Sequence, residues 1–248
     1  MNNQTGYNIN LGLLTPKQGY HLMVNHSTKK IIDLTHEIHT DMPQFIKSRP
    51  YAYIETIRHE VGNHLIGSTL CIFVDHIGTH IDAPFHFNPG GKPINEMPLE
   101  VMRSTGILLD FSYKEAGTSI KLEEVKDYFK KLNLKPRKGY SVIFYTGASK
   151  KWGSPSYFEH IVEINPKTVR WLCNNGVMVY GVDAISVDTD FVTYPTHSLL
   201  MEIEHYIVEN LTNLDTIPNP IFEFLVFPIK LRRATAAPVR AVAIVEDD

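Results

Sequence analysis

The stretch from Asp75 to Phe87, with the sequence DHIGTHIDAPFHF, decides how the rest of the chain is interpreted. Four potential metal ligands or proton carriers stand at its even-numbered positions: His76, His80, Asp82 and His86. In an extended segment with a two-residue period, these side chains would point to the same side. Imidazole nitrogens and carboxylate oxygens are ligands that zinc and manganese take in proteins. The stretch therefore predicts a metal site.

A helix would also bring His76 and His80 together, because residues four apart share a helix face. Gly78 and Pro84 argue against a helix, since Pro84 lacks the amide proton that a helix interior needs. The preceding segment Thr69–Val74 is rich in β-branched and aromatic residues and predicts a buried strand. We expect this core strand to run into an irregular extended segment, in which Pro84 ends any pairing.

A single histidine beside an apolar run is more often an ordinary core or surface residue than a ligand. Four polar groups on one side are a different case. Buried without a cation, they would crowd hydrogen-bonding and charged groups together, which costs free energy. The joint pattern favours metal binding over packing.

The run His76-x-Gly-Thr-His80-x-Asp82-x-Pro-x-His86-Phe resembles the signature of the metal-dependent cyclase family. That family includes bacterial kynurenine formamidases, isatin hydrolases and cyclase relatives. Further segments similar to the family pattern are residues 31–43, 180–188 and 237–241, so the resemblance spans about residues 30 to 245. It implies a single α/β domain of the swivelling β/β/α type with a mixed sheet core. It also implies a homodimer or larger homo-oligomer.

The resemblance implies a second metal site downstream, for which His197 and Glu209 have the family's twelve-residue separation. On one continuous helix, residues twelve apart would lie about 18 Å apart, too far to share a metal. We therefore expect the chain to turn, with a short helix over Ser198–Glu204 and extended chain over Tyr206–Leu211. Two local alternatives as ligands are His205 and Glu202.

A metal held by His76, His80 and Asp82 with one open position would lower the pKa of a bound water to about 7. A second metal on His197 and Glu209, with Asp82 bridging, would lie within about 4 Å of the first. The ligand types suit zinc first, with manganese or iron as alternatives.

By resemblance, His86 is the catalytic acid/base rather than a ligand. An imidazole could take a proton from the attacking water and hand it to the leaving nitrogen. Asp183 is expected to orient a ligand imidazole from behind, as carboxylates commonly do.

The resemblance implies a metal-dependent amidohydrolase of the arylformamidase type, which releases formate from N-formylkynurenine or a related N-formyl aryl amine. A lactam or lactone hydrolase similar to isatin hydrolase, or a cyclase, is the alternative. A non-catalytic metal-binding protein is a third, disfavoured because His86 would then have no purpose.

Candidate substrate-pocket residues come from two loops. Phe45 stands where many relatives carry Trp-Pro-Gly, so it is a candidate wall for an aryl ring. Trp152, Tyr157 and Phe158 lie in a polar and aromatic loop after a strand, where α/β proteins often bind ligands. The same three residues could equally be ordinary packing beneath a surface loop.

Length and composition limit the domain organisation and the class of partner that we expect. The 248 residues can fill one large domain, which we place at residues 29–248 after an arm or cap at residues 1–28. A net charge of −3 gives no electrostatic case for binding nucleic acid or anionic membranes, so the expected partner is a small molecule. The chain shows no secretory signal and no apolar run of about 20 residues, which predicts a cytoplasmic protein. Cys71 and Cys173 lie in apolar surroundings and are expected to be buried free thiols.

Apolar runs predict six strands: Lys30–Leu34, Thr69–Val74, Gly106–Asp110, Ser141–Tyr145, Val177–Val182 and Phe224–Leu231. A helix is expected over Lys121–Leu132, with Ser119 as its N-cap, and another over Asn165–Asn174, which starts with Asn-Pro. Each helix is followed by a strand, which indicates an α/β architecture.

Overall fold

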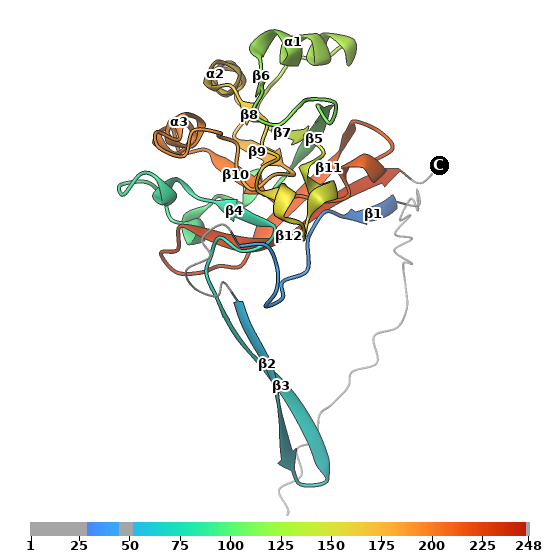
Figure 1. The fold of residues 1–248 in the computed structure, drawn as a ribbon, viewed down its shortest axis with the longest axis vertical. Coiled ribbons are helices and arrows are strands. Elements are labelled where there is room, and N and C mark those ends of the chain that lie inside the picture. The colour runs from blue at the N-terminus through green and yellow to red at the C-terminus, as the bar shows by residue number, and fades with distance from the viewer. Residues whose placement is uncertain (1–28, 45–51, 247–248) are drawn as a thin grey trace, which may run out of the picture.

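The computed structural model describes residues 29–44 and 52–246. Its body is an eight-stranded sheet in the order β1-β12-β11-β5-β7-β9-β10-β4, and β12 also pairs with β4. That additional pairing closes seven strands into a barrel-like ring, with β1 attached to the outside of β12 (Figure 1). The strands are β1 (Lys29–Asp33), β4 (His80–Asp82), β5 (Arg103–Asp110), β7 (Tyr140–Tyr145), β9 (Val179–Val182), β10 (Tyr206–Glu209), β11 (Ile221–Pro228) and β12 (Ala236–Glu246).

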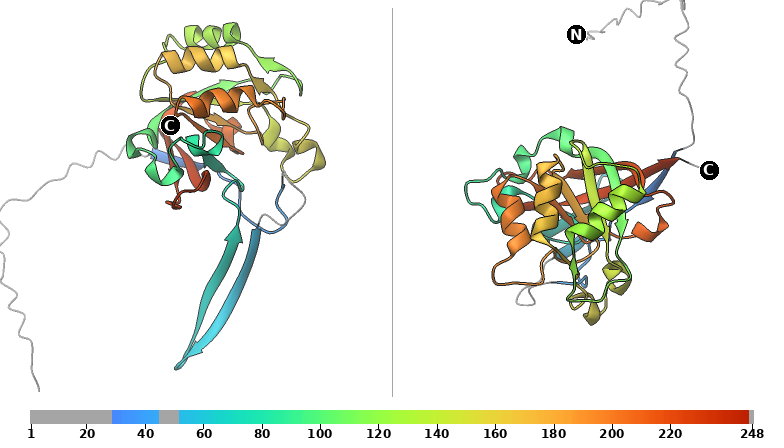
Figure 2. Two further views of the ribbon diagram at one scale, coloured as in Figure 1. Left: turned by 90° about the vertical axis from the view of Figure 1, so that its left-hand side faces the viewer. Right: turned by 90° about the horizontal axis from the view of Figure 1, so that it is seen from above.

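The sheet is mixed, as expected. Strands β5, β7, β9 and β10 run parallel to one another. The other neighbouring strands of the sheet pair in antiparallel fashion: β1 with β12, β12 with β11, β11 with β5, β12 with β4, and β4 with β10. Three helices lie in a row over one side of the parallel strands (Figures 1 and 2). They are α1 (Leu122–Lys131), α2 (Pro166–Asn174) and α3 (Pro195–Glu202). A short parallel pair, β6 (Ser119–Ile120) with β8 (Glu163–Ile164), lies beside them.

Side-chain alternation along the strands divides the core in two. In β7, Val142 and Phe144 pack toward the helices, whereas Ile143 and Tyr145 belong to the cluster inside the ring. Both faces of this strand are buried, which is why its sequence is continuously apolar rather than alternating. The parallel strands therefore have a covered outer face, and the candidate site lies at the end of that face.

Residues 69–73 of the predicted strand Thr69–Val74 lie in β3 (His64–Phe73), but the prediction that this strand is buried is wrong. Among the described residues, β3 pairs only with β2 (Ala52–Val61), and the hairpin extends away from the body (Figures 1 and 2). Nearly all of its side chains are exposed, including Cys71, which was also expected to be buried. β-branched composition indicates an extended backbone, and it does not tell what covers the faces of the strand.

The other predicted elements differ mainly at their boundaries. Ser119 is not the cap of α1, because it lies in β6; Lys121 occupies that position and its amide donates to Glu124 at 2.8 Å. Asn165 does cap α2, accepting from the Lys167 amide at 2.9 Å. β11 begins and ends three residues earlier than the predicted Phe224–Leu231 strand. Helix α3 also begins three residues early, which places His197 inside it.

None of the helices in the described part of the chain combines the length and apolar character needed to cross a bilayer. The proposed arm at residues 1–28 lies outside the described residues, so it stays a prediction.

Candidate metal centre and active site

Strand register brings the candidate ligands from β4 and β10 together. His80 pairs directly with Glu209, and Asp82 pairs with Ile207. Opposite residues of an antiparallel pair project to the same face, so His80, Asp82 and Glu209 share one side of the sheet. It is the helix side, since Ile207 packs in the helix-facing core, while Ile81 and Val208 fill the ring. α3 then supplies His197 from above this surface.

Only part of the motif is extended. His80 and Asp82 lie on β4, two residues apart on one face, whereas His76 precedes the strand and His86 closes a single 3-10 turn, Pro84–His86. The predicted uniform two-residue period is therefore wrong outside β4. The chain reaches a similar arrangement by bending at Gly78, whose φ is +55°, and at the turn after Pro84. Glycine tolerates that left-handed conformation without the strain a Cβ would cause.

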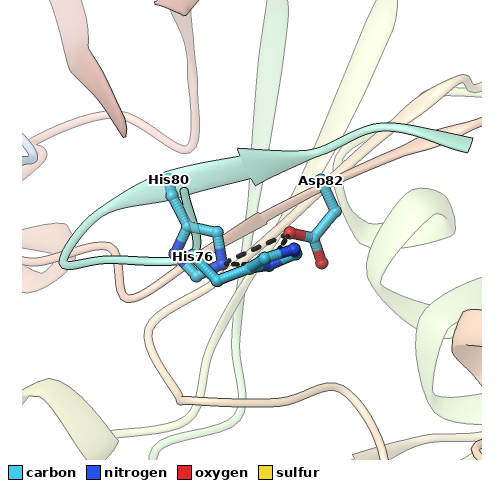
Figure 3. A group of neighbouring side chains, drawn as sticks. All are labelled: His76, His80 and Asp82. Carbon is cyan, nitrogen blue, oxygen red and sulfur yellow. Dashed lines mark hydrogen bonds and ion pairs between the residues drawn. The ribbon is translucent and has the colours of Figure 1, made fainter. Parts of the chain in front are cut away.

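The first group of potential ligands is His76, His80 and Asp82 (Figure 3). Asp82 Oδ1 lies 2.8 Å from His76 Nδ1 and 3.3 Å from His80 Nε2. The two imidazole nitrogens are themselves 3.3 Å apart. Three ligand atoms that close together, from two imidazoles and a carboxylate, form one side of a coordination shell.

The second group contains Asp82 again, with His197 and Glu209. His197 Nε2 lies 3.2 Å from Glu209 Oε1 and 3.8 Å from Asp82 Oδ2. Glu209 Oε2 is also 3.5 Å from His80 Nε2. Asp82 thus offers one oxygen to each group, which is the arrangement a bridging carboxylate needs.

The hydrogen bonding of these carboxylate oxygens indicates whether a cation fits between the two groups. Both oxygens of Asp82 and Oε1 of Glu209 are buried and accept no hydrogen bond. Buried charged oxygens without donors are costly, and a divalent cation between them would remove that cost. The donor set of nitrogen and oxygen atoms suits zinc, manganese or iron. The residues present fit a pair of divalent metals.

The pKa values of the clustered side chains reflect the negative charge that the carboxylates bring together. Burial alone would lower the pKa of His80 and His197, but the neighbouring Asp82 carboxylate raises the pKa of His80 to about 9, and the Asp188 and Glu209 carboxylates raise the pKa of His197 to about 10. Burial and the nearby charge of Asp82 raise the pKa of Glu209. The cluster therefore attracts positive charge, which protons or metal ions can supply.

Each ligand imidazole has its other nitrogen fixed. His80 Nδ1 donates to the Gly78 carbonyl at 2.9 Å. His76 Nε2 lies 3.0 Å from the Thr235 hydroxyl, which in turn donates to Asp75 at 2.7 Å. These contacts orient His76 Nδ1 and His80 Nε2 toward Asp82, as metal binding requires.

For His197, the orienting carboxylate is Asp188 and not the predicted Asp183. Asp188 Oδ2 accepts from His197 Nδ1 at 2.7 Å and also from the amide of His197 at 2.9 Å. Asp183 instead accepts from Thr146 and Ser149, so it holds the loop after β7. Asp188 precedes His197 by nine residues, and a separation of that length in the sequence does not by itself predict that the two side chains are in contact.

A cavity of about 480 Å³ opens over the metal-site residues. His86 lines it, with its ring centroid 4.0 Å from that of His76. Burial lowers the pKa of His86 to about 4, so its imidazole is neutral near pH 7. A neutral imidazole at the cavity wall can accept a proton from water.

The far walls of the cavity are apolar and aromatic. Phe87, Phe191 and Tyr194 form an aromatic group, with centroids 5.2 Å apart for Phe87 and Tyr194 and 5.6 Å for Phe191 and Tyr194. The remaining apolar walls are Pro43, Val74 and Ile185. Sequence reasoning missed these residues, although Phe87 directly follows His86 in the motif.

Trp152 and Tyr157, predicted to line the pocket, are placed behind it. Tyr157 is fully buried, and its hydroxyl donates to Asn210 Oδ1. Trp152 stacks on His36, with centroids 3.8 Å apart and an interplanar angle of 7°. Neither is among the described residues that line the cavity. Phe45 lies outside the described residues.

The remaining predicted alternatives lie away from the cluster. His205 Nδ1 contacts Cys173 Sγ at 3.3 Å, behind α3, and Glu202 is exposed at the end of that helix. Phe158 packs edge-on against Tyr157. Asn210, which sequence reasoning missed, donates to the Gly78 carbonyl at 2.7 Å and holds the His80 loop.

Comparison with known proteins shows the family and the fold of the chain. The sequence profile of the family described as "Putative cyclase" matches residues 32–189. A kynurenine formamidase from Bacillus anthracis is 29% identical over 219 residues, which cover 87% of this chain and 97% of that protein.

Two solved structures have the same fold. An isatin hydrolase bound to the product analogue thioisatinate superimposes with a TM-score of 0.77 at 19% identity, covering 88% of this chain and 93% of that one. Isatin hydrolase A from Labrenzia aggregata gives a TM-score of 0.77 at 21% identity, with 91% and 96% coverage. The expected α/β fold with a mixed sheet is confirmed.

Proposed function

The chain belongs to the cyclase family, and from this premise we propose that it is a metal-dependent hydrolase that cleaves the amide bond of an aryl compound. The observation that carries the proposal is the pair of ligand groups sharing Asp82, with its two buried oxygens free of hydrogen bonds. A structural metal site would favour closure by four protein ligands. Here the groups border a cavity instead.

The residues divide the chemistry between them. His76, His80 and Asp82 would hold one divalent ion, and Asp82, His197 and Glu209 a second, with zinc the first expectation and manganese or iron the alternatives. Ions of this kind supply Lewis acidity, which lowers the pKa of a water molecule and polarises a carbonyl oxygen.

His86 would move the proton. Its neutral imidazole accepts the proton of the attacking water and then donates it to the leaving nitrogen, because a neutral amine leaves more easily than an amide anion. Phe87, Phe191 and Tyr194 would hold the aryl ring by burying it, which excludes water from the far side of the cavity.

An arylformamidase activity is the first candidate: N-formylkynurenine, or a related N-formyl aryl amine, would yield the amine and formate. The similarity to kynurenine formamidases over 97% of their length supports it.

Lactam opening, as on isatin, is the second candidate. Among the described residues that line the cavity there is no lysine or arginine that could pair with a substrate carboxylate. A neutral bicyclic lactam needs no such partner. The similarity to isatin hydrolases supports only a shared fold between this chain and those enzymes.

Turnover measured on both substrates tests the proposal. The purified protein would be assayed with N-formylkynurenine and with isatin, before and after chelation and after zinc or manganese is restored. Chelator-sensitive hydrolysis of either compound is the expected result, and the preferred one identifies the activity. Full activity after complete metal removal, or no hydrolysis of either by a protein that holds its metals, would refute the proposal. The cytoplasmic location expected from the sequence stays a prediction.

A further inference from the structure

Asp75, directly before the ligand His76, brings a carboxylate to the wall of the cavity. Its two oxygens have different surroundings. Oδ2 accepts three hydrogen bonds, from the Thr235 hydroxyl at 2.7 Å and from the amides of Thr235 and Ala236 at 3.0 and 3.2 Å. Oδ1 accepts none from the described residues and is not one of their buried unpaired atoms, so it is accessible. The carboxylate therefore has one oxygen fixed by the protein and one oxygen free.

The charge of this carboxylate has no cationic partner in the described part of the chain. The three donors on Oδ2 favour the ionised form of Asp75. No lysine or arginine lies among the described residues that line the cavity, and none of the described side chains forms an ion pair with Asp75. The adjacent imidazole of His76 is neutral when it binds a metal. Asp75 thus leaves a negative charge at the cavity wall.

The surroundings of Asp75 strengthen its attraction for a cation. Asp75 is half-buried, and the cavity residue before it is Val74. Much of the wall outside the two ligand groups is apolar, including Pro43 and Ile185. A partly dehydrated charge attracts an opposite charge more strongly than one in bulk water does. A cationic group that enters the cavity would therefore be held at Asp75 Oδ1.

We propose that Asp75 Oδ1 binds a protonated amine of the substrate, so that the preferred substrates are aryl amides with a side chain that ends in a basic amine. This recognition presupposes the amide hydrolysis proposed above and names the chemical class of its substrate. A primary ammonium group donates up to three hydrogen bonds, and its bond to a carboxylate is stronger than a bond between neutral groups. Asp75 determines specificity here, whereas the proton transfer belongs to His86.

The distance between Asp75 and the first ligand group suits such a substrate. Two hydrogen bonds, of 2.7 and 3.0 Å, link Asp75 Oδ2 through the Thr235 hydroxyl to Nε2 of His76. Nδ1 of the same imidazole faces Asp82 in the first ligand group. The carboxylate is therefore no farther from that ligand atom than one imidazole ring and two hydrogen bonds. A short flexible side chain on the aryl ring can span this separation while the amide carbonyl lies at the ligand groups.

A purely structural role for Asp75 would use Oδ2 alone, by holding Thr235 and through it His76. Asp75→Asn separates the two roles. The asparagine keeps one oxygen that can accept from Thr235 and Ala236, but an uncharged NH₂ group replaces the free oxygen. Metal binding through His76 should therefore survive this change, whereas the attraction for an ammonium group should not.

Steady-state kinetics with matched probes tests the proposal on the full-length, metal-loaded protein. The probes are formanilides with an ortho side chain that ends in an amine, a hydroxyl or a carboxylate: aminopropyl, hydroxypropyl and carboxyethyl. For the wild type, kcat/KM should be at least about tenfold higher with the amine probe than with the hydroxyl probe, mainly through a lower KM. Asp75→Asn should lose this preference, with metal content equal to that of the wild type.

Asp41→Asn is the matched control. It also removes one negative charge, from an exposed residue two positions before the cavity residue Pro43, and it should keep the preference for the amine probe. Equal kcat/KM for the amine and hydroxyl probes in the wild type would overturn the recognition and leave the hydrolysis intact. An Asp75→Asn protein that keeps the preference would overturn it too. So would equal losses of kcat with all probes together with loss of metal, because Asp75 would then act only through His76.

Binding without turnover separates this recognition from the proposed hydrolysis. In calorimetric titrations of the metal-loaded protein, phenylpropylamine should bind at least about tenfold more tightly than phenylpropanol, and Asp75→Asn should abolish the difference. Selective amine binding without hydrolysis of any formanilide would refute the activity and support the role of Asp75. An amine that bound a metal ion instead would keep its advantage in Asp75→Asn, and that result, or equal affinities in the wild type, would overturn the recognition.

Discussion

At the scale of single residues, the three ligand imidazoles and His86 differ in one respect. His76, His80 and His197 each have one ring nitrogen bonded to a backbone or side-chain partner away from the cluster. His86 has ring neighbours instead and lies at the cavity wall. A ligand must be held in one orientation, whereas a proton carrier must reach substrate.

His86→Ala should therefore retain metal and lose activity. We expect kcat to fall by about two to four orders of magnitude, the usual contribution of a general acid/base. Elemental analysis and steady-state kinetics on the same preparation check this. His205→Ala is the control, since it removes another half-buried imidazole outside the cluster. Loss of bound metal in His86→Ala would show that His86 is a ligand.

Asp188→Asn should weaken the second metal group. Although burial alone would raise the pKa of Asp188, its bonds with His197 hold it below its usual range, so the carboxylate is ionised when it orients that imidazole. We expect metal affinity at this group to fall by about 10- to 100-fold, measured by competition with a chelating dye.

The control for this change is Asp190→Asn. Asp190 lies in the same loop but bonds Val192 and Thr193, with no contact to a ligand imidazole. Equal metal affinity in both variants would count against the role of Asp188.

At the scale of elements, the site depends on where β4 and β10 end and where α3 begins. Sequence spacing placed the proposed ligands His80 and Asp82 on one face because they lie two apart on a strand. It could not reveal that β4 pairs with both β10 and β12, since that register joins residues far apart in the chain. It also misplaced Tyr157, whose partner Asn210 is 53 residues away, and it missed Asp188, which lies only nine residues before His197.

Asn210, directly after β10, joins these elements. Its φ is +58°, and its side chain bonds the Gly78 carbonyl and the Tyr157 hydroxyl. Asn210→Ala should lower the free energy of unfolding by about 1–3 kcal/mol, because buried partners are left unpaired. It should also weaken metal binding through the His80 loop.

Asn213→Ala is the control for that prediction. Asn213 has a similar φ of +56° and donates to the Asp33 carbonyl, but it is exposed and distant from the ligands. It should leave metal binding unchanged, as followed by calorimetric titration. Equal loss of metal affinity in both variants would show that backbone strain, and not the Gly78 contact, explains the effect.

At the scale of the whole molecule, periodicity predicted the α/β class and most strands of the ring. In β7 the apolar run is buried on both sides, so composition and burial agree. In β3 composition and burial disagree, because the β2–β3 hairpin extends away from the sheet and its side chains are exposed. β-branched and aromatic residues suit an exposed hairpin strand as well as a core strand, so composition alone does not distinguish the two.

Stability should fall in mild acid. Burial lowers the pKa of His36 and of His205 to about 4 from an ordinary value near 6.5, so between those values the unfolded chain binds protons that the folded chain does not. The free energy of unfolding is thus expected to decrease as pH falls from about 6.5 toward 4.

His36→Phe isolates one of these contributions, since it keeps an aromatic ring beside Trp152 and cannot titrate. Urea unfolding at several pH values should show the variant gaining stability relative to wild type as pH falls. A constant difference from pH 7 to pH 4.5 would contradict the assignment.

The central claim is that Asp82 bridges two metal ions, and metal stoichiometry of the wild type and of Asp82→Asn tests it most directly. Elemental analysis of protein purified without chelators and reconstituted with zinc or manganese should give two equivalents per wild-type chain. Asp82→Asn should lose occupancy in both groups, because each has one Asp82 oxygen among its ligand atoms. One equivalent in the wild type, or an Asp82→Asn protein that loses only one of two, would contradict the bridged site.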